Sequence, residues 1–211
     1  MRKIIKGIEP RSLTQHRNSA HSNYDNLPTV AKQTLRENLV SEQRGLCCYC
    51  LSKIEPTESR MKIEHFEPQS LYPDKQLIYS NLFGACLGNM KGGTDTHCDT
   101  FKGNKEFHFN LCTSGSIHAE IKYKTDGEIY SDNEALNTEL NTILNLNFSS
   151  LKKARKSALD GFKDYLSTKV NGKLTNDKKI RLRDKWLGAG NSDALVPYCM
   201  IVVHYLNKRI K

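Results

Sequence analysis

The side chains best suited to metal binding and hydrolysis lie within one stretch of the sequence, residues 47–104. Cys47 and Cys50 have the two-residue spacing of a zinc knuckle, in which a tight turn lets both thiolates reach one ion. Cys86 and Cys98 form a second pair with eleven residues between them, which zinc tolerates because an inserted loop costs little closure entropy. Four thiolates fill the tetrahedral shell of Zn²⁺ and leave no open position. The spacing therefore predicts a structural zinc site.

The other three cysteines are expected to be buried core residues. Cys48 competes with Cys47 for the first ligand position, but only Cys47 has two residues between itself and Cys50. Cys112 and Cys199 belong to no ligand pattern. The sequence begins with basic residues and has no apolar run of signal-peptide length, so metal ligation is favoured over a disulfide framework.

A second group of side chains in the same stretch has the chemistry of phosphodiester hydrolysis. That reaction needs a base that deprotonates water, a cation that holds the scissile phosphate, and a group that orients the base. His65 is the candidate base because imidazole titrates near neutral pH, and Asn81 is the candidate orienting group. Glu64 and Asp99 offer the hard oxygen ligands that suit Mg²⁺ or Mn²⁺. Glu64 and His65 would point to opposite faces of a regular strand, so we expect a bend there.

The order of these motifs resembles the HNH endonuclease superfamily. The sequence reads Cys-x₂-Cys, then Glu-His-Phe-x-Pro-x-Ser, then Asn-Leu-x₃-Cys, then His-Cys-Asp-x₂-Lys-Gly. Within this superfamily, the pattern is most like that of the PtuB-type HNH subunits of Septu and related retron antiphage systems. The resemblance is close over residues 47–104 and looser over the rest of the chain. The resemblance implies a ββα-metal fold, with His65 as base, Glu64 and Asp99 as metal ligands, and Asn81 as the orienting residue.

Two departures from the superfamily pattern affect how the site is assigned. The acid before the base is usually Asp, and Glu64 is one methylene longer. The last two cysteines usually have two residues between them, whereas here they flank the insertion Gly88–Thr96. Asp99 then takes the Asn/His position directly after Cys98, and Lys102 matches the lysine of the pattern.

An alternative register of the last motif uses Asn89, with Lys91 as the lysine, but it lacks the final cysteine. We therefore prefer Asp99. His97 and Asn104 are further candidates for a phosphate or metal contact, although we expect both to be solvated loop residues.

The charge of the chain indicates a polyanionic partner. The 211 residues include 32 Lys and Arg against 23 Asp and Glu, a net charge of +9 with a pI near 9.2 and a mean hydropathy of −0.61. The segment from Leu151 to Trp186 contains twelve Lys or Arg residues and only four Asp residues. Nucleic acid is the commonest partner of such a surplus, although a solvated helix face has the same composition. The candidate contacts are Lys102, Lys152, Lys153, Arg155 and Lys156.

The hydrophobic pattern predicts short strands and helices around the site and a helical C-terminal part. We expect helices over Pro28–Gly45, Tyr79–Leu87 and Asp99–Asn104, and strands over Leu51–Glu55 and Arg60–Phe66. Alternation over 117–129 around Asp126-Gly127 predicts a hairpin, and residues 1–26 read as an extended arm or strand.

These elements predict an α+β fold: a zinc-stapled ββα-metal (HNH) nuclease lobe followed by a mainly helical lobe. The expected division is an N-terminal arm and helix (1–46), the zinc-bound HNH lobe with its hairpin (47–132), and a basic helical lobe (133–211). The apolar stretch 194–206 is too short to span a bilayer and contains Pro197 and His204, so we expect a cytoplasmic protein with no membrane contact.

The sequence and the resemblance together predict a metal-dependent HNH endonuclease that acts in antiphage defence. DNA is the favoured substrate; a tRNA-cleaving effector of a retron-type system and a non-catalytic zinc-bound nucleic-acid-binding module are the alternatives. The resemblance implies a PtuA-like ATPase partner. The sequence has no Walker A motif, so any dependence on ATP would come from another chain.

Overall fold

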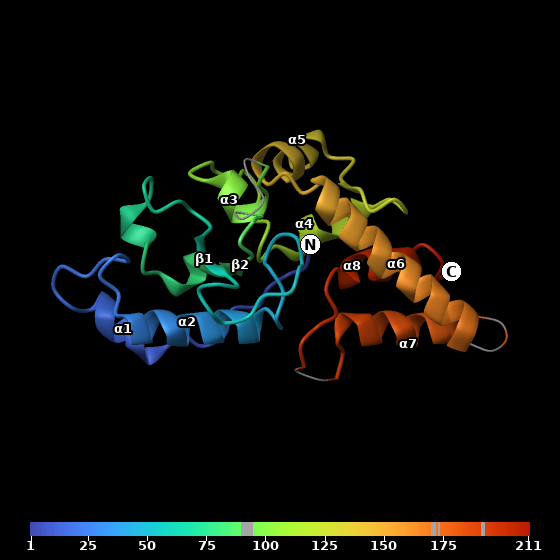
Figure 1. The fold of residues 1–211 in the computed structure, drawn as a ribbon, viewed down its shortest axis with the longest axis horizontal. Coiled ribbons are helices and arrows are strands. Elements are labelled where there is room, and N and C mark those ends of the chain that lie inside the picture. The colour runs from blue at the N-terminus through green and yellow to red at the C-terminus, as the bar shows by residue number, and fades with distance from the viewer. Residues whose placement is uncertain (90–94, 170–171, 173, 191–192) are drawn as a thin grey trace.

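The computed structural model describes residues 1–89, 95–169, 172, 174–190 and 193–211. Figure 1 shows an elongated molecule with the first two helices and the first strand pair at one end and the last three helices at the other. The first half carries the predicted site.

Two antiparallel strands and a short helix form the centre of the first half. Strand β1 (Lys62–His65) pairs with β2 (Leu82–Ala85), and His65 lies opposite Leu82. Helix α3 (Cys98–Lys102) follows, and Gly103 ends it with a positive φ of 55°. Strand, strand, helix is the order that a ββα unit requires.

The predicted helix over Tyr79–Leu87 is wrong. A single 3₁₀ turn (Tyr79–Asn81) leads directly into β2, whose four residues are all buried. A short, continuously apolar run is compatible with a buried strand or a buried helix, so periodicity alone could not separate them. The predicted strand over 51–55 is also wrong: among the described residues this segment makes only an isolated bridge between Leu46 and Lys53. A second 3₁₀ turn (Pro73–Lys75) lies between β1 and β2.

Two helices precede the strands. The predicted helix after Pro28 is confirmed as α2 (Thr29–Glu42), which buries Ala31, Leu35 and Leu39 and packs against β2. Residues 1–10 form an extended arm as expected, but the next residues form helix α1 (Arg11–Arg17), which contacts α2. In Figure 1, α1 and α2 lie beneath the strand pair.

The predicted hairpin is confirmed, but it is shorter than the alternation indicated. Strands β3 (Lys122–Tyr123) and β4 (Ile129–Tyr130) pair around the Asp126-Gly127 turn. The residues before them form helix α4 (Gly115–Glu120) instead of a strand, because the Ser114 hydroxyl accepts a hydrogen bond from the Ile117 amide and caps a helix there.

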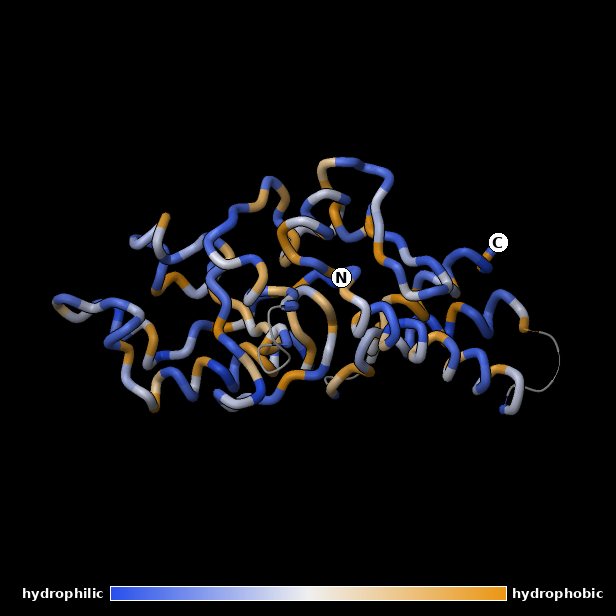
Figure 2. The backbone as a smooth tube through the Cα atoms, turned by 45° about the horizontal axis from the view of Figure 1, so that its top comes forward, coloured by the Kyte–Doolittle hydropathy of each residue, from blue (hydrophilic) through white to orange (hydrophobic). Residues whose placement is uncertain are grey.

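The C-terminal part is helical, as predicted. It comprises α5 (Glu134–Thr138), a π-helical turn (Glu139–Ile143), α6 (Ser149–Lys169), α7 (Asn176–Leu187) and α8 (Cys199–Asn207). Helix α8 packs against both α6 and α7. Hydrophilic and hydrophobic positions alternate along these helices in Figure 2, as expected when one face packs inward.

The hydrophobic core connects the two halves of the chain. One cluster of buried residues contains Cys47 and Phe83 from the first half and Leu159 and Leu206 from the last helices. The division near residue 133 stays a prediction. Within the part of the chain that the structure describes, no helix is both long and apolar enough to cross a membrane.

Candidate active site and metal centre

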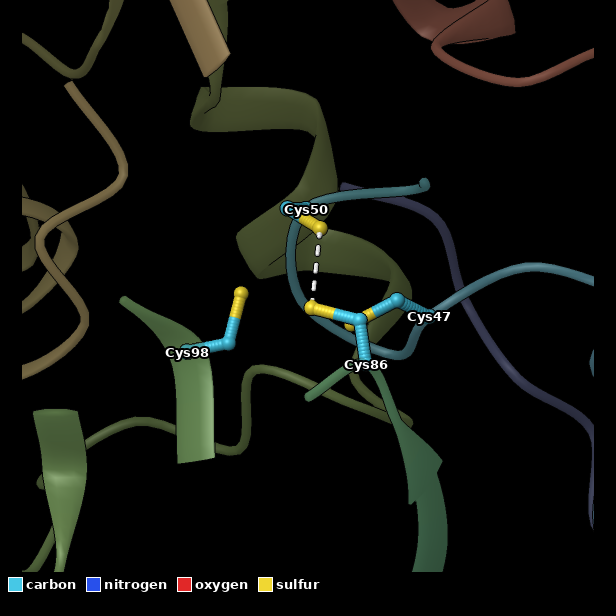
Figure 3. Close-up of side chains that lie close together, drawn as sticks. All are labelled: Cys47, Cys50, Cys86 and Cys98. Atoms are coloured by element: carbon cyan, nitrogen blue, oxygen red, sulfur yellow. Dashed lines mark hydrogen bonds between the residues drawn. The ribbon is translucent and has the colours of Figure 1, made fainter. Parts of the chain in front are cut away.

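The four cysteines predicted to bind zinc lie together. Their Sγ atoms are all within 4.8 Å of one another, and those of Cys50 and Cys86 are 3.7 Å apart (Figure 3). Zn–S bonds of about 2.3 Å in a tetrahedron place two sulfurs about 3.8 Å apart. All four side chains are buried. The spacing, burial and thiol chemistry therefore fit one tetrahedral zinc ion.

Local backbone geometry brings each pair of thiols to this point. The first pair lies on a tight turn, in which the Cys47 amide donates to Ser52 O (2.9 Å) and Leu51 has a positive φ of 65°. Cys86 directly follows β2, and Cys98 is the first residue of α3. Cys98 also has a positive φ (56°), and its amide donates to Leu144 O at 2.8 Å. A side chain with this backbone conformation is held by its surroundings.

The two ends of the insertion between Cys86 and Cys98 lie next to each other. The His97 amide donates to Gly88 O at 3.1 Å, and a Cβ on Gly88 would lie 2.3 Å from His97 O. Residues 90–94, including Lys91 of the alternative register, lie outside the described residues. Asn89 is exposed, and its side chain donates to Asp95 O. Because the two ends of the insertion meet, Cys98 reaches Cys86 despite the long spacing.

His97 is not the solvated loop residue that we expected. It is 6% exposed, and its Nδ1 atom lies 3.2 Å from Cys98 Sγ and 3.9 Å from Cys86 Sγ. A hydrogen bond to a ligating thiolate orients the ligand from outside the coordination shell. Asn104, in contrast, is exposed as expected.

The thiols act on one another electrostatically. Burial alone would raise the pKa of the Cys47 thiol, but hydrogen bonds from the neighbouring cysteines hold this pKa well below its usual range. The pKa values of Cys86 and Cys98 are correspondingly raised. A dicationic metal would favour the thiolate form of all the ligands. The three cysteines predicted to be core residues, Cys48, Cys112 and Cys199, are buried.

His65 lies at the end of β1 with one ring nitrogen already engaged. Its Nε2–H donates to Gln76 O at 3.0 Å, which leaves the Nδ1 lone pair of the neutral ring as the proton acceptor. Burial lowers the pKa of His65, and the Gln76 hydrogen bond and the charge of Asp99 oppose this shift. The ring of Tyr24 lies edge-on to the imidazole, 4.5 Å between centroids. The geometry suits a general base.

Asn81 is buried against the loop that follows His65. Its Oδ1 accepts from the Glu67 amide (2.8 Å), and its Nδ2 donates to Glu67 O (3.0 Å) and to Lys75 O (3.2 Å). These contacts tie both ends of the loop together immediately before Gln76, whose carbonyl accepts from His65.

Glu64 is 2% exposed and lies on the α3 side of β1. Its Oε1 accepts from the Tyr49 hydroxyl (2.7 Å), and the Lys102 ammonium lies 2.9 Å away. Burial, followed by the contact with the Asp99 carboxyl group, raises the pKa of Glu64 well above its usual value. Asp99 in turn pairs with Lys62 at 3.2 Å.

The paired carboxyl groups fit a hard divalent cation. Two carboxyl groups in contact share a proton when no cation is bound, and a cation such as Mg²⁺ replaces that proton. Within the described residues, the four cysteines are the only group of three or more potential ligands at close spacing. Glu64 and Asp99 would supply two oxygen ligands at most, and water or substrate would have to fill the other positions of such an ion.

Two of the five predicted nucleic-acid contacts are buried. Lys102 is 1% exposed, and its ammonium also donates to His65 O at 3.0 Å. Arg155 is 2% exposed, because it lies on the same face of α6 as the buried Leu151 and Leu159. Its guanidinium donates to Gly127 O (2.5 Å) and Leu146 O (2.7 Å). Both side chains therefore have structural partners instead of solvent.

The other three predicted contacts are at the surface. Lys153 is exposed. Lys152 pairs with Asp126 at 3.0 Å, and Lys156 pairs with Asp160 on the same helix. Ion pairs of this kind are weak, so a phosphate can displace the carboxylate.

Sequence reasoning missed two tyrosines of the site. Tyr49 stands between two metal-binding cysteines and donates to Glu64, so its place in the Cys-Cys-Tyr-Cys motif was a usable signal. Tyr24 comes from the segment interpreted as an arm and contacts His65 only in the folded chain. Nothing in its local sequence indicated this role.

No family model matches the sequence. A curated protein of Escherichia coli, named as the candidate HNH endonuclease of retron Ec83, is 25% identical in an alignment 187 residues long; the match covers 70% of this chain and 72% of that protein. The chain is thus similar, at low identity, to a protein named as an HNH endonuclease of a retron.

Proposed function

We propose that this chain is a metal-dependent HNH endonuclease that hydrolyses phosphodiester bonds in nucleic acid. The observation that carries the proposal is the state of His65: a neutral imidazole with Nε2 bound to Gln76 O and Nδ1 left as an acceptor, on the strand that carries Glu64. The named E. coli relative supports nuclease chemistry independently.

The residues of the site would divide the reaction between them. His65 Nδ1 takes the proton of the attacking water, and the Gln76 carbonyl stabilises the imidazolium that forms. Asn81 fixes the loop that presents Gln76. Glu64 and Asp99 would hold a Mg²⁺ or Mn²⁺ ion, with Lys102 keeping the Glu64 carboxylate in place. When bound, that ion would polarise the scissile phosphate and stabilise the leaving oxygen.

The test compares wild type with His65→Gln, which keeps the size and hydrogen bonding of the residue and removes the base. Both proteins are incubated with plasmid DNA and with total tRNA in Mg²⁺ or Mn²⁺. We expect the variant to lose roughly 10²–10⁴-fold in rate, the usual contribution of a general base, with unchanged zinc content. Equal rates in the two proteins would remove His65 from the mechanism.

We further propose that the enzyme acts within an antiphage defence complex, with DNA favoured over tRNA and with a PtuA-like ATPase as its partner. The relative's name, which refers to a retron, supports the defence setting. The ATPase partner and the preference for DNA rest on the resemblance of the sequence motifs to PtuB-type subunits. The partner is tested by coexpressing the chain with a PtuA-like ATPase, followed by copurification and by cleavage assays with and without ATP. Cleavage of tRNA alone by that complex would contradict the DNA assignment.

A further inference from the structure

Arg36 is a mostly buried cation whose guanidinium is poorly paired within the part of the chain that the structure describes. Its side chain is 12% exposed, and its Nε has no partner among the described residues. The nearest acid is Glu58, whose carboxylate is 3.8 Å away and 89% exposed. An exposed pair at that distance contributes little, whereas each buried donor left without an acceptor costs about 1–3 kcal/mol. The surrounding protein therefore does not satisfy this guanidinium.

Arg36 lies one turn of α2 beyond Lys32, whose ammonium contacts the Tyr24 ring beside His65. Burial raises the pKa of Tyr24 to about 12, and Arg36 is the cation that most strongly opposes this rise. The Asp99 carboxylate acts on the same hydroxyl, and the Tyr24 ring touches His65. Tyr24 therefore contacts His65 through its ring, and its hydroxyl is subject to the charges of both Arg36 and Asp99. Its hydroxyl stays protonated at neutral pH and can donate a hydrogen bond.

A second cation comes from the same face of the same helix. Lys32 precedes Arg36 by four residues in α2, so their side chains lie on one face. The Lys32 ammonium lies 5.1 Å from the centre of the Tyr24 ring. Gln76 fixes Tyr24 from the other direction, because its side-chain oxygen accepts from the Tyr24 amide at 2.9 Å. One loop therefore holds both Tyr24 and His65.

We infer that Arg36, Lys32 and the Tyr24 hydroxyl form a binding subsite for a backbone phosphate of the nucleic acid, next to the phosphate that is cleaved. A phosphate supplies the oxygen acceptors that the guanidinium lacks, and the planar guanidinium fork matches two phosphate oxygens. The subsite would hold the strand in register with His65 and carry no base preference. This inference rests on the proposed nuclease function.

The test uses Arg36→Gln in the His65→Gln background, so that substrate is bound without being cut. Binding of fluorescent duplex DNA and of tRNA is measured by anisotropy over a series of salt concentrations. We expect Arg36→Gln to weaken binding by about ten-fold or more. The slope of log K against log salt should fall by about 0.9 for the duplex, the effect of one lost phosphate contact. Arg60→Gln is the matched control, because Arg60 is 69% exposed, and it should leave both quantities unchanged.

Arg36→Lys is a second variant, which tests the subsite if Arg36→Gln does not fold. Lysine retains the charge and loses the fork, so we expect weaker binding with an unchanged salt slope. If the His65-intact protein cleaves nucleic acid and neither Arg36 variant changes affinity, the subsite is wrong and the nuclease stands. If that protein neither cleaves nor binds DNA or tRNA, the proposed function fails and the subsite fails with it.

Discussion

Lys102 connects the helix of the site to its strand. Its ammonium reaches Glu64 and the carbonyl of His65, two consecutive residues of β1, and lies 5.6 Å from the centre of the Phe107 ring. A buried ion pair adds little net stability, but removing one partner leaves the other charge buried and alone. Lys102 therefore holds Glu64 and the backbone of His65 in position, and it is almost fully buried.

Substituting Lys102 by Met should destabilise the protein and leave the surface charge of the basic helices unchanged. We expect a loss of up to about 3–5 kcal/mol in the free energy of unfolding, less if Glu64 takes up a proton. Urea denaturation measures this loss. Lys153→Met, at an exposed position on α6, is the control and should change the free energy by no more than about 0.5 kcal/mol. Equal free energies for the two variants would show that the pair contributes no specific stability.

At this scale, sequence reasoning identified residue types better than their partners. The spacing rule selected the four cysteines, because ligand spacing is a local property of a turn. Sequence reasoning assigned Lys102 and Arg155 to nucleic-acid contact at the surface, because charge predicts exposure unless a partner distant in sequence is known; both are buried. For Lys102 that partner is thirty-eight residues away, at Glu64. Arg36 carried no signal in the sequence at all.

The hairpin turn and helix α6 form one packed unit. Gly127 has a φ of 90°, and a Cβ there would lie 2.0 Å from Lys152 O. The carbonyl of Gly127 accepts from Arg155 Nε, and Lys152 pairs with Asp126. The turn therefore docks on the first turns of α6 through backbone approach, a buried guanidinium and an ion pair.

Two glycine substitutions separate this docking from general helix effects. Gly127→Ala should destabilise the protein by about 2–4 kcal/mol, since both its φ and the contact with α6 forbid a Cβ. Gly161→Ala, inside α6 with no atom within 4 Å of the added Cβ, should stabilise it by roughly 0.5–1 kcal/mol. Thermal unfolding followed by circular dichroism distinguishes the two. A neutral Gly127→Ala would mean that the turn does not dock in solution.

Helix α2 and the hairpin were predictable from proline, glycine and turn signals, whereas the Ser114 cap of α4 was overlooked and β2 carries no local signal. Pro28 and Gly45 bracket α2, and Asp126-Gly127 marks the hairpin. Strand β2 has no such signal, since its burial depends on pairing with β1. Such pairing is decided by tertiary context, which outweighs local propensity for short segments.

At the scale of the whole molecule, the four-cysteine cluster predicted to bind zinc is part of the continuous core. The cysteine ligands belong to the same buried cluster as residues from α6 and α8. Structural zinc contributes its binding free energy to folding. If zinc is bound there, its loss should therefore weaken the entire protein and not only the half that carries the candidate site.

Replacing Cys50 by Ser tests this coupling. We expect the variant to lose its zinc and to unfold at a much lower temperature, with the signal of the C-terminal helices lost in the same transition. Cys199→Ser is the matched control: Cys199 is equally buried but lies outside the thiol cluster, so zinc should stay at one per chain. Metal analysis and thermal unfolding measure both effects. Zinc-free wild-type protein would contradict the assignment of the four ligands.

The contact between Gly88 and His97 has a consequence for the comparison of sequences. The His97 amide donates to Gly88 O, so the two ends of the insertion meet beside the cysteine cluster whatever the number of residues between them. Relatives of this protein can then differ widely in the length of that excursion while keeping one coordination geometry. A pattern written for such proteins should anchor the glycine and the residue before the last cysteine, and leave the gap between them free.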